Sequence, residues 1–152
     1  MIHVRGNILH VTRGIICHQV NAKGVMGAGL ALQIKQKWPV VFRDYNQQHR
    51  KKHLKTGEVI FTNIVQGDYK LQVASLCAQQ DYGTGPNKVY TNYEAFEACL
   101  KKLQIWHVSC IQGKLPIYFP YKIGCGLAGG DWAVIRSMIG RYFPNAIIME
   151  KV

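Results

Sequence analysis

Short apolar runs alternate with amphipathic segments along the whole chain, and this alternation limits the folds that the chain can adopt. The apolar runs predict strands at residues 2–8, 13–20, 58–65, 69–77, 115–119 and 146–149. Apolar residues at helical spacing predict helices in the stretch that ends at Pro39, over residues 41–50, from Thr91 and from Trp132. Strands that alternate with helices favour an α/β fold, specifically a three-layer α/β/α sandwich.

Two details of the expected strands describe the central sheet. The run GIICHQV at residues 14–20 is apolar almost throughout, as expected for a strand that is covered on both faces. Only Gln66, Gly67 and Asp68 separate the third and fourth expected strands, which is short enough for an antiparallel hairpin. We therefore expect a mixed sheet, in a single domain that spans residues 1–152.

The chain is strongly basic. Nineteen lysines and arginines against eight acidic residues give a formal net charge of +11. Such a charge favours polyanions such as nucleic acid, or anionic small molecules such as phosphate esters. The densest basic run, at residues 49–55, ends an expected helix, where cations also suit the helix dipole. Both interpretations of this run stay open.

Other features of the composition predict a reduced, cytoplasmic protein without a membrane partner. No apolar stretch approaches the roughly 18 residues that would span a bilayer, and the N-terminus lacks the apolar core of a secretion signal. The cysteines are scattered and form no C-x-x-C pair, which disfavours a disulfide framework or a zinc site: Cys17, Cys77, Cys99, Cys110 and Cys125. We expect neither a metal nor a cofactor.

Packing of the core alone does not explain why two segments are rich in glycine: GVMGAGLALQIKQKWP at residues 24–39 and PYKIGCGLAGGDW at residues 120–132. Each runs from the end of an expected strand into a helix, and ligands of open α/β sheets bind at such loops. Glycine exposes backbone N–H groups, and the helix adds its positive end. The pair predicts a cradle for a diphosphate, whereas a plain turn is the alternative for either loop alone. The first loop is neither a Walker loop nor a complete G-x-G-x-x-G, which disfavours ATP hydrolysis and hydride transfer.

Three segments together resemble the macro domain family: GNIL at residues 6–9, CHQVNAKGVMGAGLALQI at residues 17–34 and the second glycine-rich segment. Their order and spacing match that family across essentially the whole chain. H-Q-V-N and G-C-G-L resemble more narrowly the branch with the yeast-type ADP-ribose-1''-phosphate phosphatase and the human-type terminal ADP-ribose glycohydrolase. The resemblance implies ADP-ribose or a derivative as the ligand. It leaves an ADP-ribosylated protein or nucleic acid open as a partner.

The resemblance also implies where the ligand would lie. Adenine is expected near Asn7 and Ile8, where most family members carry an aspartate; the amide carbonyl of Asn7 still accepts a hydrogen bond from the adenine amino group. Asn21 is expected to reach the distal ribose. Backbone amides of both glycine loops would wrap the diphosphate and the distal ribose, at Gly27, Ala28, Gly29, Gly124, Cys125, Gly126, Leu127 and Ala128.

Two residues are candidates for catalysis. His18 occupies the phosphatase-like H-x-x-N position, as general acid, general base or phosphoryl acceptor. Strand alternation places it on the face of Ile16 and Val20, so a hydrogen-bonded core histidine is the alternative. Asp131 is the only acid near either glycine loop, with a role toward substrate or water, or as the N-cap of the next helix. For Cys125 a buried small residue is favoured over a reactive thiol.

The sequence departs from the human-type glycohydrolase at both of that enzyme's catalytic positions. That enzyme uses a lysine, through a covalent sugar adduct, and an aspartate directly after G-C-G-L. Here Ala128 follows G-C-G-L, and no lysine occurs from Ala78 until Lys88. Phosphate release from ADP-ribose 1''-phosphate is therefore favoured over two alternatives, a de-ADP-ribosylating hydrolase with substrate-assisted attack by water and a non-catalytic reader. The loop at residues 79–87, with Asp81, either connects two elements or closes over the distal ribose.

Overall fold

A computed structural model describes residues 1–85, 87–109 and 114–152 of the chain. The elements follow in the order β1 (Ile2–Arg5), a 3₁₀ helix η1 (Ile8–His10), β2 (Arg13–Asn21), α1 (Gly29–Lys37), α2 (Pro39–Lys52), β3 (Val59–Ile64), β4 (Lys70–Gln79), α3 (Tyr93–Ser109), β5 (Ile117–Pro120), α4 (Trp132–Tyr142) and β6 (Ile147–Glu150). No helix among the described residues is long and apolar enough to cross a membrane.

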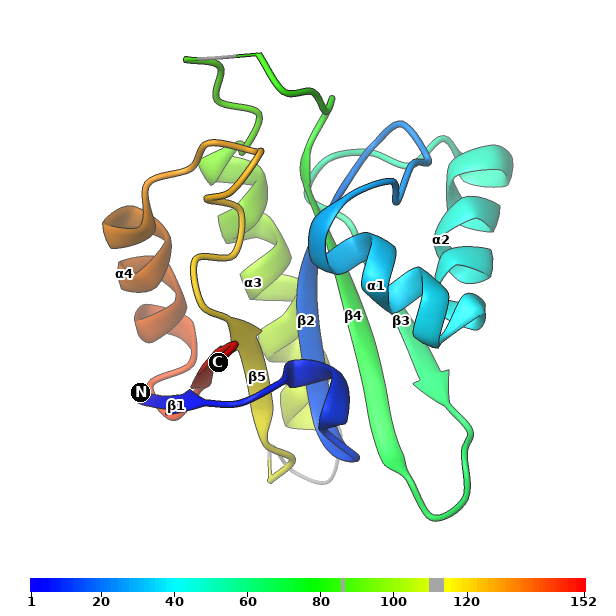
Figure 1. Cartoon of the computed structure of the whole chain (residues 1–152), viewed down its shortest axis with the longest axis vertical. Helices are drawn as coiled ribbons and strands as arrows, with labels where there is room; N and C mark the ends of the chain where they lie inside the picture. The colour runs from blue at the N-terminus through cyan, green and yellow to red at the C-terminus, as the bar shows by residue number, and fades with distance from the viewer. Residues whose placement is uncertain (86, 110–113) are drawn as a thin grey trace.

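The strands form one six-stranded sheet in the order β1-β6-β5-β2-β4-β3. Strand β3 pairs antiparallel with β4, while the other pairs are parallel. Helices α1 and α2 cover one face, and α3 and α4 cover the other (Figure 1). The expected three-layer α/β/α sandwich with a mixed sheet and a β3–β4 hairpin is confirmed.

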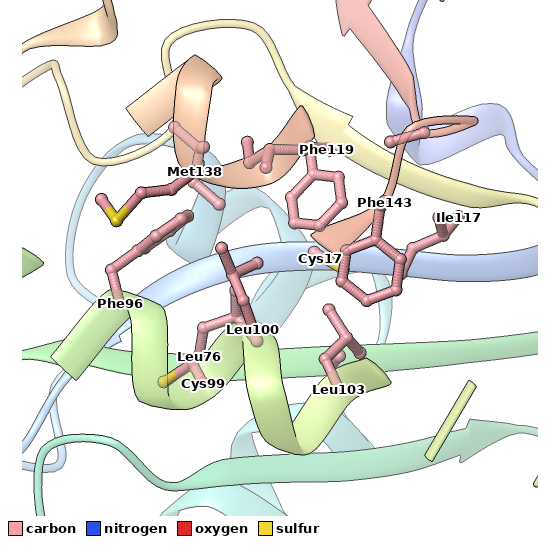
Figure 2. Packing of buried hydrophobic residues seen from close by; sticks show 14 of the residues in the cluster. Cys17, Leu76, Phe96, Cys99, Leu100, Leu103, Ile117, Phe119, Met138 and Phe143 are labelled. Carbon is pink, nitrogen blue, oxygen red and sulfur yellow. The ribbon is translucent and has the colours of Figure 1, made fainter. Parts of the chain in front are cut away.

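Strand β2 lies at the centre of the sheet, as its apolar sequence predicts. Its side chains alternate between two core clusters, with Ile15 and Cys17 in the cluster under α3 and α4, and Ile16 and Val20 in the cluster under α1 and α2. Figure 2 shows part of the first cluster, where side chains of α3 pack beside Phe119 and neighbouring residues of β5 and α4. Because β2 is held on both faces, it is a rigid base for the residues at its carboxyl end.

Several boundaries differ from the expectation by one to three residues, among them those of β1 and α2. Strand β1 ends at Arg5, short of Ile8, because the side chain of Asn7 accepts a hydrogen bond from Leu9 N and caps η1. Helix α2 begins earlier than expected, at Pro39, a residue well suited to the first position of a helix. It also continues past Arg50 to Lys52.

The described cysteines, Cys17, Cys77, Cys99 and Cys125, carry free thiols, and Cys110 lies outside the described residues. Burial raises the pKa of the Cys77 thiol to about 12, and the nearby Glu58 adds to the shift. In the part of the chain that the structure describes, no group of three or more histidine, cysteine, aspartate or glutamate side chains is placed to hold a metal ion.

The carboxyl ends of three neighbouring parallel strands, β5, β2 and β4, meet at one edge of the sheet. The segments that follow them, residues 22–28, 80–85 with 87–92, and 121–131, lie at this edge, which is uppermost in Figure 1. The two glycine-rich segments therefore face each other across the end of β2, as their positions in the sequence predict.

Candidate ligand-binding site

Two adjoining cavities open between these loops, with volumes of about 320 and 240 Å³. Residues that line both cavities come from β2, β4, the start of α1 and the second glycine loop: Gln19, Ala28, Ala31, Gln79, Leu127 and Ala128. The larger cavity extends toward Tyr82 and Thr84, and the smaller one toward Tyr121 and Lys122. We call the two together the binding groove.

The first glycine loop is organised by Asn21. Its Oδ1 accepts hydrogen bonds from Lys23 N (3.0 Å) and from the hydroxyl of Tyr45 (2.8 Å), and its Nδ2 donates to Val25 O (2.8 Å). The side chain thus ties the loop to itself and to α2. Asn21 lines the larger cavity, and its Nδ2 has a second N–H besides the one that it donates to Val25 O. The expected contact with a distal ribose stays a prediction.

The start of α1 is open toward the groove. Ala28 is its N-cap and makes no side-chain capping bond, and the first turn holds no acidic residue. Leu32 N donates to Ala28 O, which leaves the earlier N–H groups, at Gly29, Leu30 and Ala31, outside the hydrogen-bond ladder of the helix. These residues line the smaller cavity. An uncapped helix N-terminus of this kind attracts an anion.

The second glycine loop is fastened to the segment that precedes α3. Gly124 O accepts hydrogen bonds from Thr91 Oγ1 (2.6 Å) and Gly130 N (2.8 Å), and Ala128 O accepts from Tyr90 N (2.8 Å). Gly124 has a φ of +74°, a conformation that favours glycine. Leu127, at the outer turn of this loop, is 58% exposed and lies over the groove.

Asp131 caps α4. Its Oδ1 accepts a hydrogen bond from Ala133 N (2.9 Å), and its own N–H donates to the hydroxyl of Tyr93 (2.9 Å). The N-cap interpretation is therefore confirmed. Asp131 is not among the residues that line either cavity, so a catalytic role stays a prediction.

Cys125 is half-buried and its Sγ lies 3.3 Å from Ile123 O. Burial raises the pKa of this thiol, and the charge of Asp131 adds to the shift, while Lys122 opposes it. The thiol is therefore protonated at neutral pH and is not an activated nucleophile.

His18 is buried, with 1% of its surface exposed, on the face of β2 that strand alternation predicts. Its Nε2 lies 2.7 Å from Ser75 Oγ on the neighbouring strand, whereas Nδ1 is buried without a partner. Burial lowers the pKa of His18 to about 3, so the imidazole is neutral at physiological pH. A general-acid role, which needs the protonated ring, is disfavoured by this environment. His18 nevertheless lines the smaller cavity.

Asn7 and Ile8 lie outside the two cavities. The Asn7 carbonyl that was expected to accept from adenine accepts from Leu9 N (2.9 Å), and Ile8 is buried in the core beneath α1. Adenine binding at these residues stays a prediction. In the loop after β4, Tyr82 and Thr84 line the larger cavity, whereas the carboxylate of Asp81 accepts from Tyr82 N (2.8 Å).

Sequence reasoning did not find Gln19, which lies at the centre of the groove. Its Nε2 donates to Gln79 Oε1 (2.8 Å) and to Thr91 Oγ1 (2.9 Å), and its Oε1 is buried without a partner. This network joins β2, β4 and the second glycine loop through Thr91. A signal was present, because Gln19 is a second polar residue beside His18 in an otherwise apolar, buried strand.

Comparison with known proteins identifies the family. The macro domain model matches residues 17–139. A protein of unknown function from Bacteroides thetaiotaomicron is 25% identical, with a TM-score of 0.83 over 99% of this chain and 97% of that one. The macrodomain of Mycobacterium tuberculosis DarG is 19% identical, with a TM-score of 0.80 over 99% and 97% of the two chains.

Thermosipho africanus DarTG, solved in complex with ADP-ribose, is 18% identical, with a TM-score of 0.80 over 99% of this chain and 42% of that one. No curated protein matches the sequence significantly. The family model covers most of the chain, and the structural matches extend over nearly all of it with the same fold. This chain belongs to the macro domain family.

Proposed function

We propose that this protein binds ADP-ribose, or a derivative of it, in the binding groove. The observation that carries the proposal is the uncapped N-terminus of α1, whose free N–H groups at Gly29 to Ala31 open onto the groove. A diphosphate supplies the acceptor oxygens and the negative charge that such an end lacks. ADP-ribose is bound in the structures of Thermosipho africanus DarTG and of the Trypanosoma brucei macrodomain, which supports this ligand.

The lining of the groove suits a ligand with one anionic part and neutral sugars. Among the described residues that line it, Lys122 alone carries a charge at pH 7, because His18 is neutral. Hydrogen bonds from backbone amides and the positive charge of Lys122 would thus stabilise the negative charge of the diphosphate. Neutral hydrogen-bonding groups, such as those of Gln19 and Thr84, would meet the ribose hydroxyls.

Calorimetric titration with ADP-ribose tests the proposal. Ala31 lines both cavities, so Ala31→Phe is expected to fill the groove and abolish binding. Ala133→Phe, at an exposed position on α4, is the matched control and should leave the affinity unchanged. The proposal is wrong if the unaltered protein does not bind ADP-ribose, or if Ala31→Phe binds it as well as the control does.

Hydrolysis of ADP-ribose 1''-phosphate to ADP-ribose and phosphate is the second candidate function. The observation that favours it is the unpartnered Nδ1 of His18, beside the cavity where the free amides of α1 would stabilise a phosphoryl group. With a pKa of about 3, His18 would orient the phosphate or an attacking water as a neutral ring. It would not deliver a proton.

Phosphate release from ADP-ribose 1''-phosphate tests this candidate. We expect release that is lost in His18→Ala, with ADP-ribose affinity retained. Asp131→Asn keeps the cap of α4 while removing the charge, so release that is lost in this variant assigns a catalytic role to the carboxylate. Binding without release would contradict the phosphatase and leave the reader, or a hydrolase to be assayed on ADP-ribosylated protein and nucleic acid.

A further inference from the structure

The positive charge of the chain is concentrated in the segment that contains α1 and α2. Residues 22–57 hold a single carboxylate, Asp44, beside eight of the nineteen lysines and arginines: Lys23, Lys35, Lys37, Arg43, Arg50, Lys51, Lys52 and Lys55. We call these eight residues the basic face. The remaining 116 residues hold eleven lysines and arginines and seven carboxylates, a net charge of +4 against +7 for residues 22–57. The net charge of the protein is therefore mainly a property of this one region.

Two carboxylates lie within or directly beside this segment of the sequence, Asp44 and Glu58. Glu58 accepts hydrogen bonds from Lys55 N (3.2 Å) and Gln48 Nε2 (3.1 Å). Asp44 lies 3.5 Å from Arg43 and also accepts a hydrogen bond from Thr62 Oγ1 (2.9 Å). Among the described residues, the other cations of the face form no salt bridge. Lys35 instead lies over the ring of Phe42, which joins α1 to α2 at this surface.

The helix dipole accounts for only part of the cluster. Arg50, Lys51 and Lys52 lie in the last turn of α2, and Lys55 follows shortly after it. The dipole places about half a negative charge at a helix C-terminus. Three or four positive charges exceed that by several-fold, and they repel one another. All four residues are exposed, so a counter-anion from solution can reach them.

The face also lacks the apolar surface that protein partners use. The large exposed hydrophobic residues of the described chain, such as Val65, Tyr82 and Leu127, all lie outside residues 22–57. Protein interfaces usually have an apolar centre, whereas contacts to nucleic-acid phosphates need cations alone. Among the described residues of this region no phenylalanine, tyrosine or tryptophan is exposed, and His53 is the exposed residue with an aromatic ring, so few rings are available to stack on unpaired bases.

We propose that the basic face binds double-stranded nucleic acid through its phosphate backbone, without reading the base sequence. This surface is separate from the binding groove, because none of its residues lines either cavity. The two regions are neighbours, however. The ring of His49, in the last turn of α2, packs so closely on Gly24 of the first glycine loop that a Cβ at this glycine would lie 2.6 Å from it.

Fluorescence anisotropy with a short labelled DNA duplex of mixed sequence tests the proposal. The test variant combines Arg50→Gln, Lys51→Gln and Lys52→Gln, and the matched control combines Lys101→Gln, Lys102→Gln and Arg136→Gln, which are exposed on α3 and α4. Both triple variants lose the same net charge. Between about 50 and 200 mM salt, the logarithm of the affinity should fall linearly with the logarithm of the salt concentration.

We expect the basic-face variant to bind at least about tenfold more weakly, with a salt slope reduced by about 2 to 3, and the control to change little. Equal weakening of the two variants would overturn the proposal, since net charge alone would then explain binding. So would the absence of duplex binding at low salt, or equally effective displacement by polyglutamate of matched charge, which would indicate an acidic protein partner. Circular dichroism melting verifies that both variants are folded.

Discussion

The two glycine loops look alike in the sequence but end in different ways. The first leads into α1, whose N-cap residue Ala28 makes no side-chain bond, and the second leads into α4, which is capped by the carboxylate of Asp131. The Asp131 side chain takes up one N–H of α4, that of Ala133, and places a negative charge at this helix end, whereas α1 has neither a capping bond nor an acidic residue in its first turn. We therefore expect the anion at the start of α1 and not at the start of α4.

The loops also differ in why they contain glycine. Gly29 and Gly129 both have a positive φ, of +57° and +72°. A Cβ at Gly29 would meet no atom within 4 Å, whereas a Cβ at Gly129 would lie 2.6 Å from Lys88 O. In the first loop the glycine leaves room beside the groove. In the second it allows two segments of backbone to approach each other.

The largest expected effect follows from this difference. Gly129→Ala adds a clash with backbone to an unfavourable φ and should lower the free energy of unfolding by about 3 to 4 kcal/mol. Gly29→Ala meets only the backbone strain and should cost about 1 to 2 kcal/mol. Urea denaturation of both variants measures the difference.

Gly67→Ala, in the β3–β4 turn, is the control for Gly29→Ala, since Gly67 has a φ of +56° and a Cβ added there would meet no atom within 4 Å. These two variants should lose similar stability. Equal losses in Gly29→Ala and Gly129→Ala would show that the loops do not differ as described.

The next prediction concerns the pH dependence of stability, which His18 in β2 should cause and the neighbouring Gln19, which does not titrate, should not. The pKa of His18 is about 3 in the folded protein, below the ordinary value of 6.5, so the unfolded state takes up the proton first as the pH falls. The stability that the neutral ring provides is complete above pH 6.5 and is lost progressively as the pH falls toward 3. Between pH 7 and pH 5 we expect a loss of about 2 kcal/mol.

Urea denaturation at the two pH values measures this loss. His18→Gln, which keeps a hydrogen-bonding group toward Ser75 without a titrating ring, should remove most of the dependence on pH. A variant that is as sensitive to pH as the unaltered protein would indicate that other groups cause the effect.

Removing the cap of α4 should destabilise the protein slightly, and adding a cap to α1 should stabilise it slightly. Asp131→Ala removes the cap of α4 and should cost about 1 kcal/mol, whereas Asp131→Asn should be nearly neutral, because asparagine is also a good N-cap. Thermal unfolding monitored by circular dichroism measures both. Equal destabilisation by the two substitutions would mean that the charge of Asp131, and not its hydrogen bond to Ala133 N, stabilises the helix.

Ala28→Asn supplies the cap that α1 lacks and should raise the free energy of unfolding by about 0.5 to 1 kcal/mol. The same thermal measurement applies. A destabilised variant would show that the start of α1 does not accept a cap, and that its open end is imposed by packing.

The sequence was sufficient for features that depend on local pattern. Apolar spacing located α4 from Trp132 to Tyr142, and the two glycine-rich segments were correctly expected at one edge of the sheet. Strand alternation also predicted the face on which His18 lies. These features follow from side-chain periodicity and chain order alone.

The remaining features depend on partners that are distant in the sequence. The place of Gln19 in the groove depends on its hydrogen bonds to Gln79 and Thr91, which the sequence does not place beside it. The low pKa of His18 likewise depends on its burial beside Ser75. The end of β1 was missed because the side chain of Asn7 bonds the local backbone and competes with the strand.

Calorimetric titration with ADP-ribose of the unaltered protein, Ala28→Asp and Asp131→Asn tests the central claim most directly. An aspartate at position 28 would occupy the free N–H groups of α1 and repel the diphosphate, so we predict an affinity at least about tenfold lower. Asp131→Asn, at the capped helix, should bind as the unaltered protein does. Undiminished binding by Ala28→Asp would contradict the claim that the open end of α1 holds the diphosphate.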